Sequence, residues 1–330
     1  MKEILNRLIN QESISTEEAK SVLVNISKGE YNQSQIASFL TVYMMRSITI
    51  EELQGFRDAL LELCNAVTFD GYDTIDLCGT GGDGKDTFNI STLASFVAAG
   101  AGIKVTKHGN YGVSSKCGSS NVMEDLGIKF SSDQSFLSKC LDEAGICVLH
   151  APLFHPAMKN VAPIRKDLGV KTFFNMLGPM VNPAFPKYQM VGVFSLELLR
   201  LYGYLYQNTQ KGYTIVHSLD GYDEISLTGN AKVMSTHSEQ ILKPEDFGVN
   251  KLEQSDIFGG DSVAASSKIF TDVLKGNGTK AQNQVVCANA ALAIATVTDC
   301  SILNGFQYAM ESIKSKKALK SFETLIELSK

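Results

Sequence analysis

The sequence lacks several features that would assign it to a well-known class of protein. It contains no tryptophan, and no stretch approaches the ~18 consecutive apolar residues that a membrane-spanning helix requires. Residues 1–7 carry charges where a secretory signal peptide has an apolar core. The seven cysteines are scattered and form no C-x-x-C pair, which is typical of a reducing cytosol. We therefore expect a cytoplasmic protein that does not span a membrane.

Motifs of the common catalytic centres are also missing. The five histidines show none of the spacings that zinc sites use, and there is no G-x-S-x-G nucleophile motif. Lys and Arg number 30 against 35 Asp and Glu, which gives a net charge of −5. A protein that coats nucleic acid usually carries the opposite charge, so we expect no nucleic-acid partner. A local site for a small anion is compatible with this balance.

The length and the apolar patterns predict two domains. At roughly 100–200 residues per domain, 330 residues suffice for two. Residues 1–66 show helical spacing without a convincing strand, so we expect a helical domain there. Residues 70–330 alternate strand and helix patterns, which predicts an α/β domain with a mostly parallel central sheet. One helix is expected over residues 155–168, and part of the proline-containing stretch 163–186 is expected to join the helical domain.

A glycine-rich loop follows the first predicted strand. Gly79-Thr-Gly-Gly-Asp-Gly84 comes directly after residues 74–78, and a helix starts a few residues later. Glycines let backbone N–H groups approach an anion closely, and a helix N-terminus favours negative charge. The hydroxyl groups of Thr87, Ser91 and Thr92 can bind phosphate oxygens or a metal ion. The loop therefore predicts a phosphate site, whereas a turn that only redirects the chain is the simpler alternative.

The same loop also matches the dinucleotide fingerprint G-x-G-x-x-G. Gly79, Gly81 and Gly84 stand at the required spacing. That fingerprint expects an acidic residue about 20 positions later to hold a ribose hydroxyl. The sequence has Lys-Val-Thr-Lys at residues 104–107 instead, so a nicotinamide cofactor is not favoured.

A second cluster of polar residues follows the next predicted strand. It consists of Lys107-His-Gly-Asn110, then Ser114 and Ser115, and finally Gly118-Ser119 at the start of a short helix. The carboxyl ends of neighbouring parallel strands meet at one edge, so this loop should face the first across a crevice. A surface lysine or a packed histidine would be the ordinary interpretation of each residue alone.

Two further positions carry charges suited to small ligands. Asp223 and Glu224 follow the predicted strand over residues 213–217, and adjacent carboxylates beside phosphate groups can hold Mg²⁺. An acidic surface turn is the alternative for such a pair. Arg165 has the planar guanidinium that binds carboxylates in two places, although a surface ion pair fits it equally well.

Four motifs, in this order, resemble the anthranilate phosphoribosyltransferase family over nearly the whole chain. They are Gly79–Gly84 with Asn89–Thr92, Lys107–Asn110 with Ser114-Ser115 and Gly118-Ser119, His155–Lys159 through Arg165, and Asp220–Glu224; Phe174–Pro179 is also similar to the family. The resemblance implies a small helical domain, a large α/β domain like that of nucleoside phosphorylases and phosphoribosyltransferases, and a homodimer. The implied reaction transfers the phosphoribosyl group of phosphoribosyl pyrophosphate (PRPP) to the amine of anthranilate, the second step of tryptophan synthesis from chorismate.

The resemblance also implies roles for particular residues. PRPP would contact both loops, through Gly79, Gly82, Asp83, Thr87, Asn89, Ile90, Ser91, Thr92, Lys107, His108, Gly109, Asn110, Ser114, Ser115 and Ser119. Anthranilate would lie against a second set with its carboxylate on the arginine: Gly79, Asn110, Arg165, His108, His155 and Gly178. Two Mg²⁺ ions per chain would be held by Ser91, Asp223 and Glu224. No covalent nucleophile is expected.

Some positions depart from the commoner family pattern. Tyr111 stands where arginine is frequent, Asn121 where aspartate is usual, and Asn160 where histidine is frequent. Two alternatives stay open at this point. A pyrimidine-nucleoside phosphorylase would share the fold but would not need the acidic pair or Mg²⁺. A non-catalytic relative that binds nucleic acid would need a broad basic surface, which the net charge disfavours.

Overall fold

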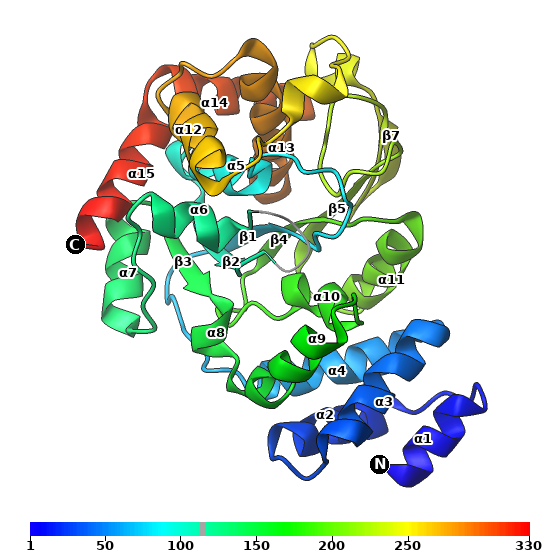
Figure 1. The fold of residues 1–330 in the computed structure, drawn as a ribbon. Coiled ribbons are helices and arrows are strands. Elements are labelled where there is room, and N and C mark those ends of the chain that lie inside the picture. Colours follow the sequence, from blue (N-terminus) through cyan, green and yellow to red (C-terminus); the bar gives the residue numbers. More distant parts are fainter. Residues whose placement is uncertain (113–116) are drawn as a thin grey trace. The chain divides into compact units, whose positions relative to one another are not determined.

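The computed structural model describes residues 1–112 and 117–330, so the predicted binding residues Ser114 and Ser115 lie outside the described part. The chain divides into two compact units (Figure 1). The helical unit comprises Met1–Val67 and Ala151–Phe185, and the sheet unit comprises Thr68–His150 and Pro186–Lys330. The helical unit is therefore discontinuous in sequence, and its second segment begins at Ala151, ahead of the proline-containing stretch.

The helical unit is built from short helices around an aromatic cluster. Its elements are α1 (Lys2–Ile9), α2 (Thr16–Ser27), α3 (Gln33–Met45), α4 (Ile50–Glu62), α8 (Ala151–Phe154), η1 (Pro156–Asn160), α9 (Ala162–Leu168), α10 (Phe174–Leu177) and η2 (Gly178–Met180). Helices α2, α3 and α4 each begin with a capping box, in which side chains satisfy backbone N–H groups of the first turn. The rings of Phe39, Tyr43, Phe56 and Phe173 pack within 6.0 Å of one another.

The prediction of one helix over residues 155–168 is wrong. The chain forms a 3₁₀ turn, η1, and then the separate helix α9, with Val161 between them. Pro163 explains the break, because proline has no N–H to donate and its ring crowds the preceding turn. It is tolerated in the first turn of α9, where no intrahelical partner would be available.

The sheet unit contains one seven-stranded sheet with the order β3-β2-β1-β4-β5-β6-β7. The strands are β1 (Thr74–Gly79), β2 (Lys104–Gly109), β3 (Ile146–His150), β4 (Tyr188–Gly192), β5 (Gly212–Ser218), β6 (Ala231–Ser235) and β7 (Glu239–Leu242). Strands β1 to β5 pair in parallel, whereas β6 and β7 are antiparallel. The predicted fold class, a small helical domain with a mostly parallel α/β domain, is confirmed, although the β6–β7 hairpin was not predicted.

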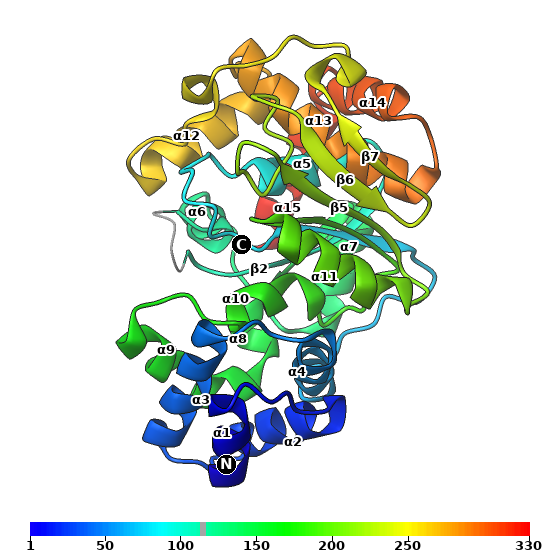
Figure 2. The same cartoon turned by 90° about the vertical axis from the view of Figure 1, so that its right-hand side faces the viewer.

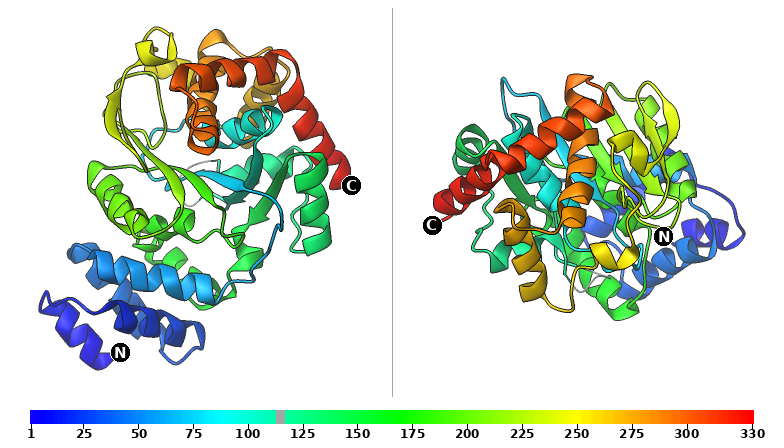
Figure 3. Two further views of the ribbon diagram at one scale, coloured as in Figure 1. Left: turned by 180° about the vertical axis from the view of Figure 1, so that it is seen from behind. Right: turned by 90° about the horizontal axis from the view of Figure 1, so that it is seen from above.

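Helices cover both faces of this sheet. Figure 1 shows α5 and α13 on one face and α11 on the other, and Figure 2 and Figure 3 show the same layers from other sides. The β1-to-β2 connection, which contains α5, and the β4-to-β5 connection, which contains α11, run in opposite directions along the sheet. Because crossovers between parallel strands are right-handed, the two helices lie on opposite faces. The helices are α5 (Ile90–Gly100), α6 (Ser119–Asp125), α7 (Gln134–Glu143), α11 (Leu196–Gln207), α12 (Val263–Leu274), α13 (Lys280–Thr298), α14 (Ile302–Lys314) and α15 (Lys317–Leu328), with the 3₁₀ turns η3 (Pro244–Phe247) and η4 (Gln254–Ile257).

The helices among the described residues differ in length and in apolar content from membrane-spanning helices. No single helix there is both long and apolar enough to cross a bilayer. Helices α13 and α14 satisfy the length and composition only when they are taken together, and they are bent by 117° at their junction.

Candidate active site

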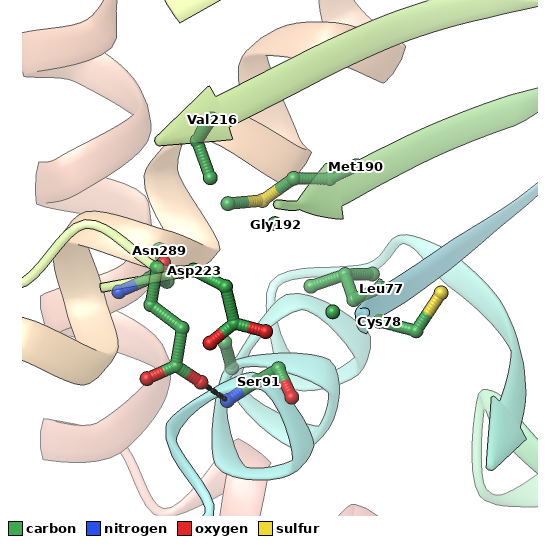
Figure 4. Close-up of a pocket in the computed structure, with 11 residues that line it drawn as sticks. Leu77, Cys78, Ser91, Met190, Gly192, Val216, Asp223 and Asn289 are labelled. Atoms are coloured by element: carbon green, nitrogen blue, oxygen red, sulfur yellow. Dashed lines mark hydrogen bonds between the residues drawn. The ribbon is translucent and has the colours of Figure 1, made fainter. Parts of the chain in front are cut away.

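The candidate site in the sheet unit forms where parallel strands end. The glycine-rich loop begins at the end of β1 and the acidic pair follows β5. The second polar cluster was expected to follow its strand, but its first three residues, Lys107 to Gly109, form the end of β2. Strands β1, β4 and β5 are neighbours, so their carboxyl ends share one edge of the sheet. Figure 4 shows a pocket at this edge, lined in part by Gly79, Ser91, Gly192, Asp223, Glu224 and Asn289. This is the position at which open α/β sheets bind their ligands.

Glycines allow the acidic loop to approach the sheet edge. A β-carbon at Gly79 would lie 2.5 Å from Asp223 Oδ2, and one at Gly192 would lie 1.5 Å from the backbone oxygen of Asp223. Gly81 adopts φ of 63°, a left-handed conformation that L side chains rarely adopt, and its N–H donates to Asp223 Oδ2 at 2.7 Å. The glycine loop and the acidic loop are therefore in direct contact.

The acidic pair also reaches the start of α5. The backbone N–H of Ser91 donates to Glu224 Oε1 at 3.2 Å, drawn as a dashed line in Figure 4, and Thr87 Oγ1 lies 3.5 Å from Glu224 Oε2. The pair thus accepts hydrogen bonds from both ends of the predicted phosphate loop. Three buried oxygens of that loop have no hydrogen-bond partner among the described residues: Thr80 Oγ1, Asn89 Oδ1 and Thr92 Oγ1. Buried polar atoms normally have partners, so this cradle is suited to a polar ligand.

Burial and repulsion dominate the electrostatics of the acidic pair. Asp223 is only 8% exposed. Loss of hydration, followed by the nearby Asp83 carboxylate, raises the pKa of Asp223 to about 7. Burial, and then the charges of Asp223 and Asp83, raise the pKa of Glu224 well above its ordinary value. Both carboxylates therefore need a positive charge nearby to remain ionised at neutral pH.

The donor set fits Mg²⁺ shared with a phosphate ligand. No group of three or more Asp, Glu, His or Cys side chains in residues 1–112 and 117–330 is arranged to hold a metal ion by itself. Mg²⁺ is commonly bound by one or two carboxylates together with substrate phosphates and water. The adjacent carboxylates of Asp223, which is buried, and Glu224, which is half-buried, both with raised pKa values, therefore fit Mg²⁺.

Lys107 lies in the interior rather than on the surface. It is 1% exposed, and its Nζ donates to the backbone oxygen of Leu77 at 2.7 Å. Burial lowers the pKa of Lys107, and the Asp76 carboxylate acts in the opposite direction. Asp76 also accepts a hydrogen bond from the His108 N–H at 3.1 Å. Lys107 thus places a buried positive charge close to the end of β1.

The second polar loop packs tightly against α6. The backbone oxygen of Asn110 accepts hydrogen bonds from the Ser120 N–H at 3.2 Å and from Ser119 Oγ at 3.3 Å. A β-carbon at Gly109 would lie 2.6 Å from Ser119 Oγ. Asn110 Oδ1 accepts from the Tyr111 N–H at 2.8 Å.

The departures from the family pattern in this loop have local partners. The Tyr111 ring packs edge-on against His150, with centroids 4.8 Å apart, and its hydroxyl lies 3.3 Å from Glu124 Oε2. Asn121 Oδ1 accepts hydrogen bonds from the N–H groups of Gly112 and Gly118, each at 3.0 Å. Both residues therefore stabilise the loop through contacts within the sheet unit.

Arg165 lies in the helical unit without an acidic partner. Its Nη2 donates to Asn175 Oδ1 at 3.2 Å, and its guanidinium lies 5.4 Å from the centre of the Phe174 ring. Burial lowers the pKa of Arg165. Its Nε is buried without a hydrogen-bond partner, and no ion pair joins Arg165 to a carboxylate in the part of the chain that the structure describes. A half-buried guanidinium whose Nε has no partner among the described residues is suited to an anionic ligand.

The other predicted residues of the helical unit have different surroundings. His155 is 5% exposed, and burial lowers its pKa to about 4, so it is neutral at physiological pH. A β-carbon at Gly178 would meet no atom within 4 Å, so this glycine borders open space. Asn160 donates through Nδ2 to the backbone oxygens of Ile26 and Ser27, which caps the end of α2. Asn160 thus has a structural contact in place of a ligand.

Several supporting residues were not predicted from the sequence. Asn289 on α13 forms hydrogen bonds with both backbone groups of Ile225, and Ser218 Oγ donates to the Glu224 backbone oxygen at 2.5 Å. Lys85 Nζ lies 4.8 Å from the centre of the Tyr222 ring, which joins the glycine loop to the acidic loop. A lone amide within the apolar segment 285–294 was the available indication of Asn289.

Comparison with known families covers both units. Residues 2–64 match the glycosyl transferase family, helical bundle domain, and residues 71–319 match the glycosyl transferase family, a/b domain. The two matches together account for most of the chain. The chain therefore belongs to this glycosyl transferase family.

Individual relatives within that family share one name, anthranilate phosphoribosyltransferase. A protein from Flavobacterium johnsoniae named anthranilate phosphoribosyltransferase is 70% identical over 329 residues and covers 100% of both chains. The crystal structure of anthranilate phosphoribosyltransferase from Thermus thermophilus has a TM-score of 0.91 at 30% identity, over 98% of each chain. That from Saccharomyces cerevisiae, in complex with PRPP and Mg, has a TM-score of 0.91 at 28% identity, over 99% of this chain and 97% of that one. The chain is a member of the anthranilate phosphoribosyltransferases, which confirms the resemblance inferred from the motifs.

Proposed function

We propose that this chain transfers the 5-phosphoribosyl group of PRPP to the amine of anthranilate, giving N-(5-phosphoribosyl)anthranilate and pyrophosphate. The acidic pair Asp223 and Glu224, in contact with both ends of a phosphate-type loop at the sheet edge, is the observation that carries this proposal. The 70% identity to a relative of that name supports it. A phosphorylase acting on pyrimidine nucleosides is not favoured, because it has no need of the acidic pair.

Both loops of the sheet unit supply groups for PRPP. The N-terminal end of α5, which favours negative charge, and the oxygens of Thr80, Asn89 and Thr92, which have no partner among the described residues, support phosphate binding. Lys107 adds a buried positive charge. We assign the remaining PRPP contacts to the residues of the two loops named from the family resemblance, with Ser114 and Ser115 among them outside the described residues.

Mg²⁺ is the cofactor that this site fits, and the Mg-bound relative supports its use. Asp223, Glu224 and the hydroxyl of Ser91 would hold it, and we infer two ions per chain. Mg²⁺, when bound, neutralises negative charge on the departing pyrophosphate.

Anthranilate requires a site for a carboxylate next to a flat ring. Arg165, whose Nε is buried and which pairs with no carboxylate among the described residues, is our candidate for the carboxylate. We also assign Asn110, His108, His155, Gly79 and Gly178 to this substrate. His155 is neutral, so it can contact the aromatic ring without adding charge.

The chemistry needs no covalent nucleophile. When the bond from ribose C1 to the pyrophosphate oxygen breaks, its electron pair leaves with the pyrophosphate and positive charge develops on the sugar. The anthranilate nitrogen then bonds to C1 and releases its proton to solvent. Donors fixed in advance around the pyrophosphate stabilise the charge that develops there, and positioning of the two reactants supplies much of the remaining rate. We further propose a homodimer in the cytoplasm.

Loss of anthranilate fluorescence tests this function directly. The purified protein is mixed with anthranilate, PRPP and Mg²⁺, with EDTA as the metal control. We expect metal-dependent loss that disappears in the double variant Asp223→Asn, Glu224→Gln and persists in Asp272→Asn, whose carboxylate pairs with Lys268 on the surface of α12. If the folded protein causes no loss of anthranilate fluorescence, the proposal is rejected. Thymidine or uridine with phosphate would then be assayed as substrates.

A further inference from the structure

Asn289 is a buried polar residue in the middle of the apolar helix α13. It is 2% exposed, and its side chain forms three hydrogen bonds. Nδ2 donates to the backbone oxygens of Ile225 at 2.9 Å and Val285 at 2.8 Å, and Oδ1 accepts from the Ile225 N–H at 3.0 Å. One side chain therefore pairs with both backbone groups of the residue that directly follows Glu224.

The neighbouring backbone is held from other sides. Ser218 Oγ, at the end of β5, donates to the Glu224 oxygen at 2.5 Å and accepts from the Ser226 N–H at 3.2 Å. The backbone oxygen of Asp223 lies directly against Gly192, where no side chain would fit. The acidic loop is thus attached to β4, β5 and α13 over consecutive residues.

This attachment opposes the separation of two adjacent, poorly hydrated carboxylates, those of Asp223 and Glu224. When two like charges have lost hydration, the free energy of the protein falls if they move apart or reach water. Rotation of the peptide groups of Glu224 and Ile225 would let them do so, but Ser218 and Asn289 hold those groups in place. The fixed backbone therefore keeps the two carboxylates side by side, so that a divalent cation shared with a diphosphate can bind both.

We propose that Asn289 is a positioning residue, which acts through the Ile225 peptide to hold the Asp223 and Glu224 carboxylates in place for a divalent cation and the diphosphate of PRPP. Asn289 itself is not assigned to any substrate. The inference rests on the proposed function, because that function assigns the cation and the diphosphate to this loop. A purely structural Asn289 would stabilise α13 without affecting cation binding.

The test compares two variants of the same helix in the full-length protein. Asn289→Ala removes the contacts with Ile225. Thr296→Val is the matched control, since Thr296 Oγ1 bonds to Thr214 Oγ1 at 2.7 Å and so joins α13 to β5 away from the acidic loop. Mn²⁺ serves as the probe, and its binding with inorganic pyrophosphate is followed by the loss of the free Mn²⁺ signal in electron paramagnetic resonance.

We expect Asn289→Ala to weaken Mn²⁺ binding by roughly 10- to 100-fold, the usual effect of removing a residue that orients metal ligands. The KM for PRPP should rise in parallel, whereas the KM for anthranilate should change little. Thr296→Val should lower the melting temperature but leave Mn²⁺ binding as in the original protein. Unchanged Mn²⁺ binding in Asn289→Ala would overturn the inference.

A second variant covers the case in which Asn289→Ala does not fold. Ser218→Ala removes the two side-chain hydrogen bonds of Ser218 to this loop, those with the Glu224 oxygen and the Ser226 N–H, and should weaken Mn²⁺ binding in the same direction. Wild-type levels of binding in this variant would then count against the inference. Absence of anthranilate turnover in the unaltered protein would reject the proposed function, while the Mn²⁺ titration would still decide the role of Asn289.

Discussion

Neutralising Asp223 should stabilise the cation-free protein while it abolishes activity. In the unfolded chain this carboxyl ionises with an ordinary pKa of 3.8, but in the folded protein burial and Asp83 raise its pKa to about 7. Below pH 4 both states bind the proton. Between pH 4 and 7 only the folded state retains it, so folded stability falls as the pH rises and the full cost is present above pH 7.

The magnitude follows from the two pKa values. Each tenfold change in an equilibrium corresponds to about 1.4 kcal/mol, so ionised Asp223 costs the folded protein ~4 kcal/mol above pH 7. Asn at this position can still accept the Gly81 N–H, but it also buries an amide NH₂ group. We therefore expect Asp223→Asn to gain about 1–3 kcal/mol. For a unit of this size, that gain raises the melting temperature by roughly 2–10 °C.

The assay is thermal unfolding in EDTA at pH 5 and pH 8. The gain in melting temperature of Asp223→Asn over the unaltered protein should be large at pH 8 and smaller at pH 5. Asp220→Asn is the matched control in the same loop. Asp220 accepts hydrogen bonds from the Ser226 and Thr228 hydroxyl groups, so its neutralisation should lower the melting temperature. An Asp223→Asn variant that melts at or below the unaltered protein at pH 8 would refute the reasoning.

Three other substitutions test separate parts of the site. Arg165→Met should raise the KM for anthranilate by about 10- to 100-fold, because the charge-assisted pair between the guanidinium and the carboxylate is lost. An unchanged KM for anthranilate in steady-state kinetics would show that Arg165 does not bind this carboxylate. Gly192→Ala should displace Asp223, since a β-carbon there would lie 1.5 Å from its backbone oxygen, and should raise the Mg²⁺ concentration at half-maximal rate. Asn160→Ala uncaps α2 and should lower stability by about 1 kcal/mol without changing either KM, as thermal unfolding and kinetics together would reveal.

The parts of the site that depend on local sequence were predictable. The glycine loop needs positive φ angles at Gly81 and Gly84, and that requirement is visible as glycine in the sequence. The acidic pair follows an apolar strand, so its position at the sheet edge follows from the parallel topology. In both cases neighbours along the chain determine the geometry.

The supporting contacts were not predictable because they join distant residues. Asn289 and Ile225 are 64 positions apart, and nothing local to either residue indicates the other. The β6–β7 hairpin escaped prediction for a related reason, because the exposed residues of β7 show little apolar alternation. The burial of Lys107 was not predicted either, because only the register of β2 between β1 and β3 places this residue in the interior.

The discontinuity of the helical unit has a consequence for biosynthesis. Leu77 of β1 pairs with Met190 of β4, although the two residues are 113 positions apart in the chain and the second helical segment lies between them. At about 5–20 residues per second, a ribosome needs roughly 6–20 s to make that intervening stretch. During this interval one side of β1 is an open strand edge, the kind of surface on which nascent chains aggregate. This topology therefore affects the yield of newly made protein, through aggregation of the nascent chain, more than it affects the stability of the folded protein.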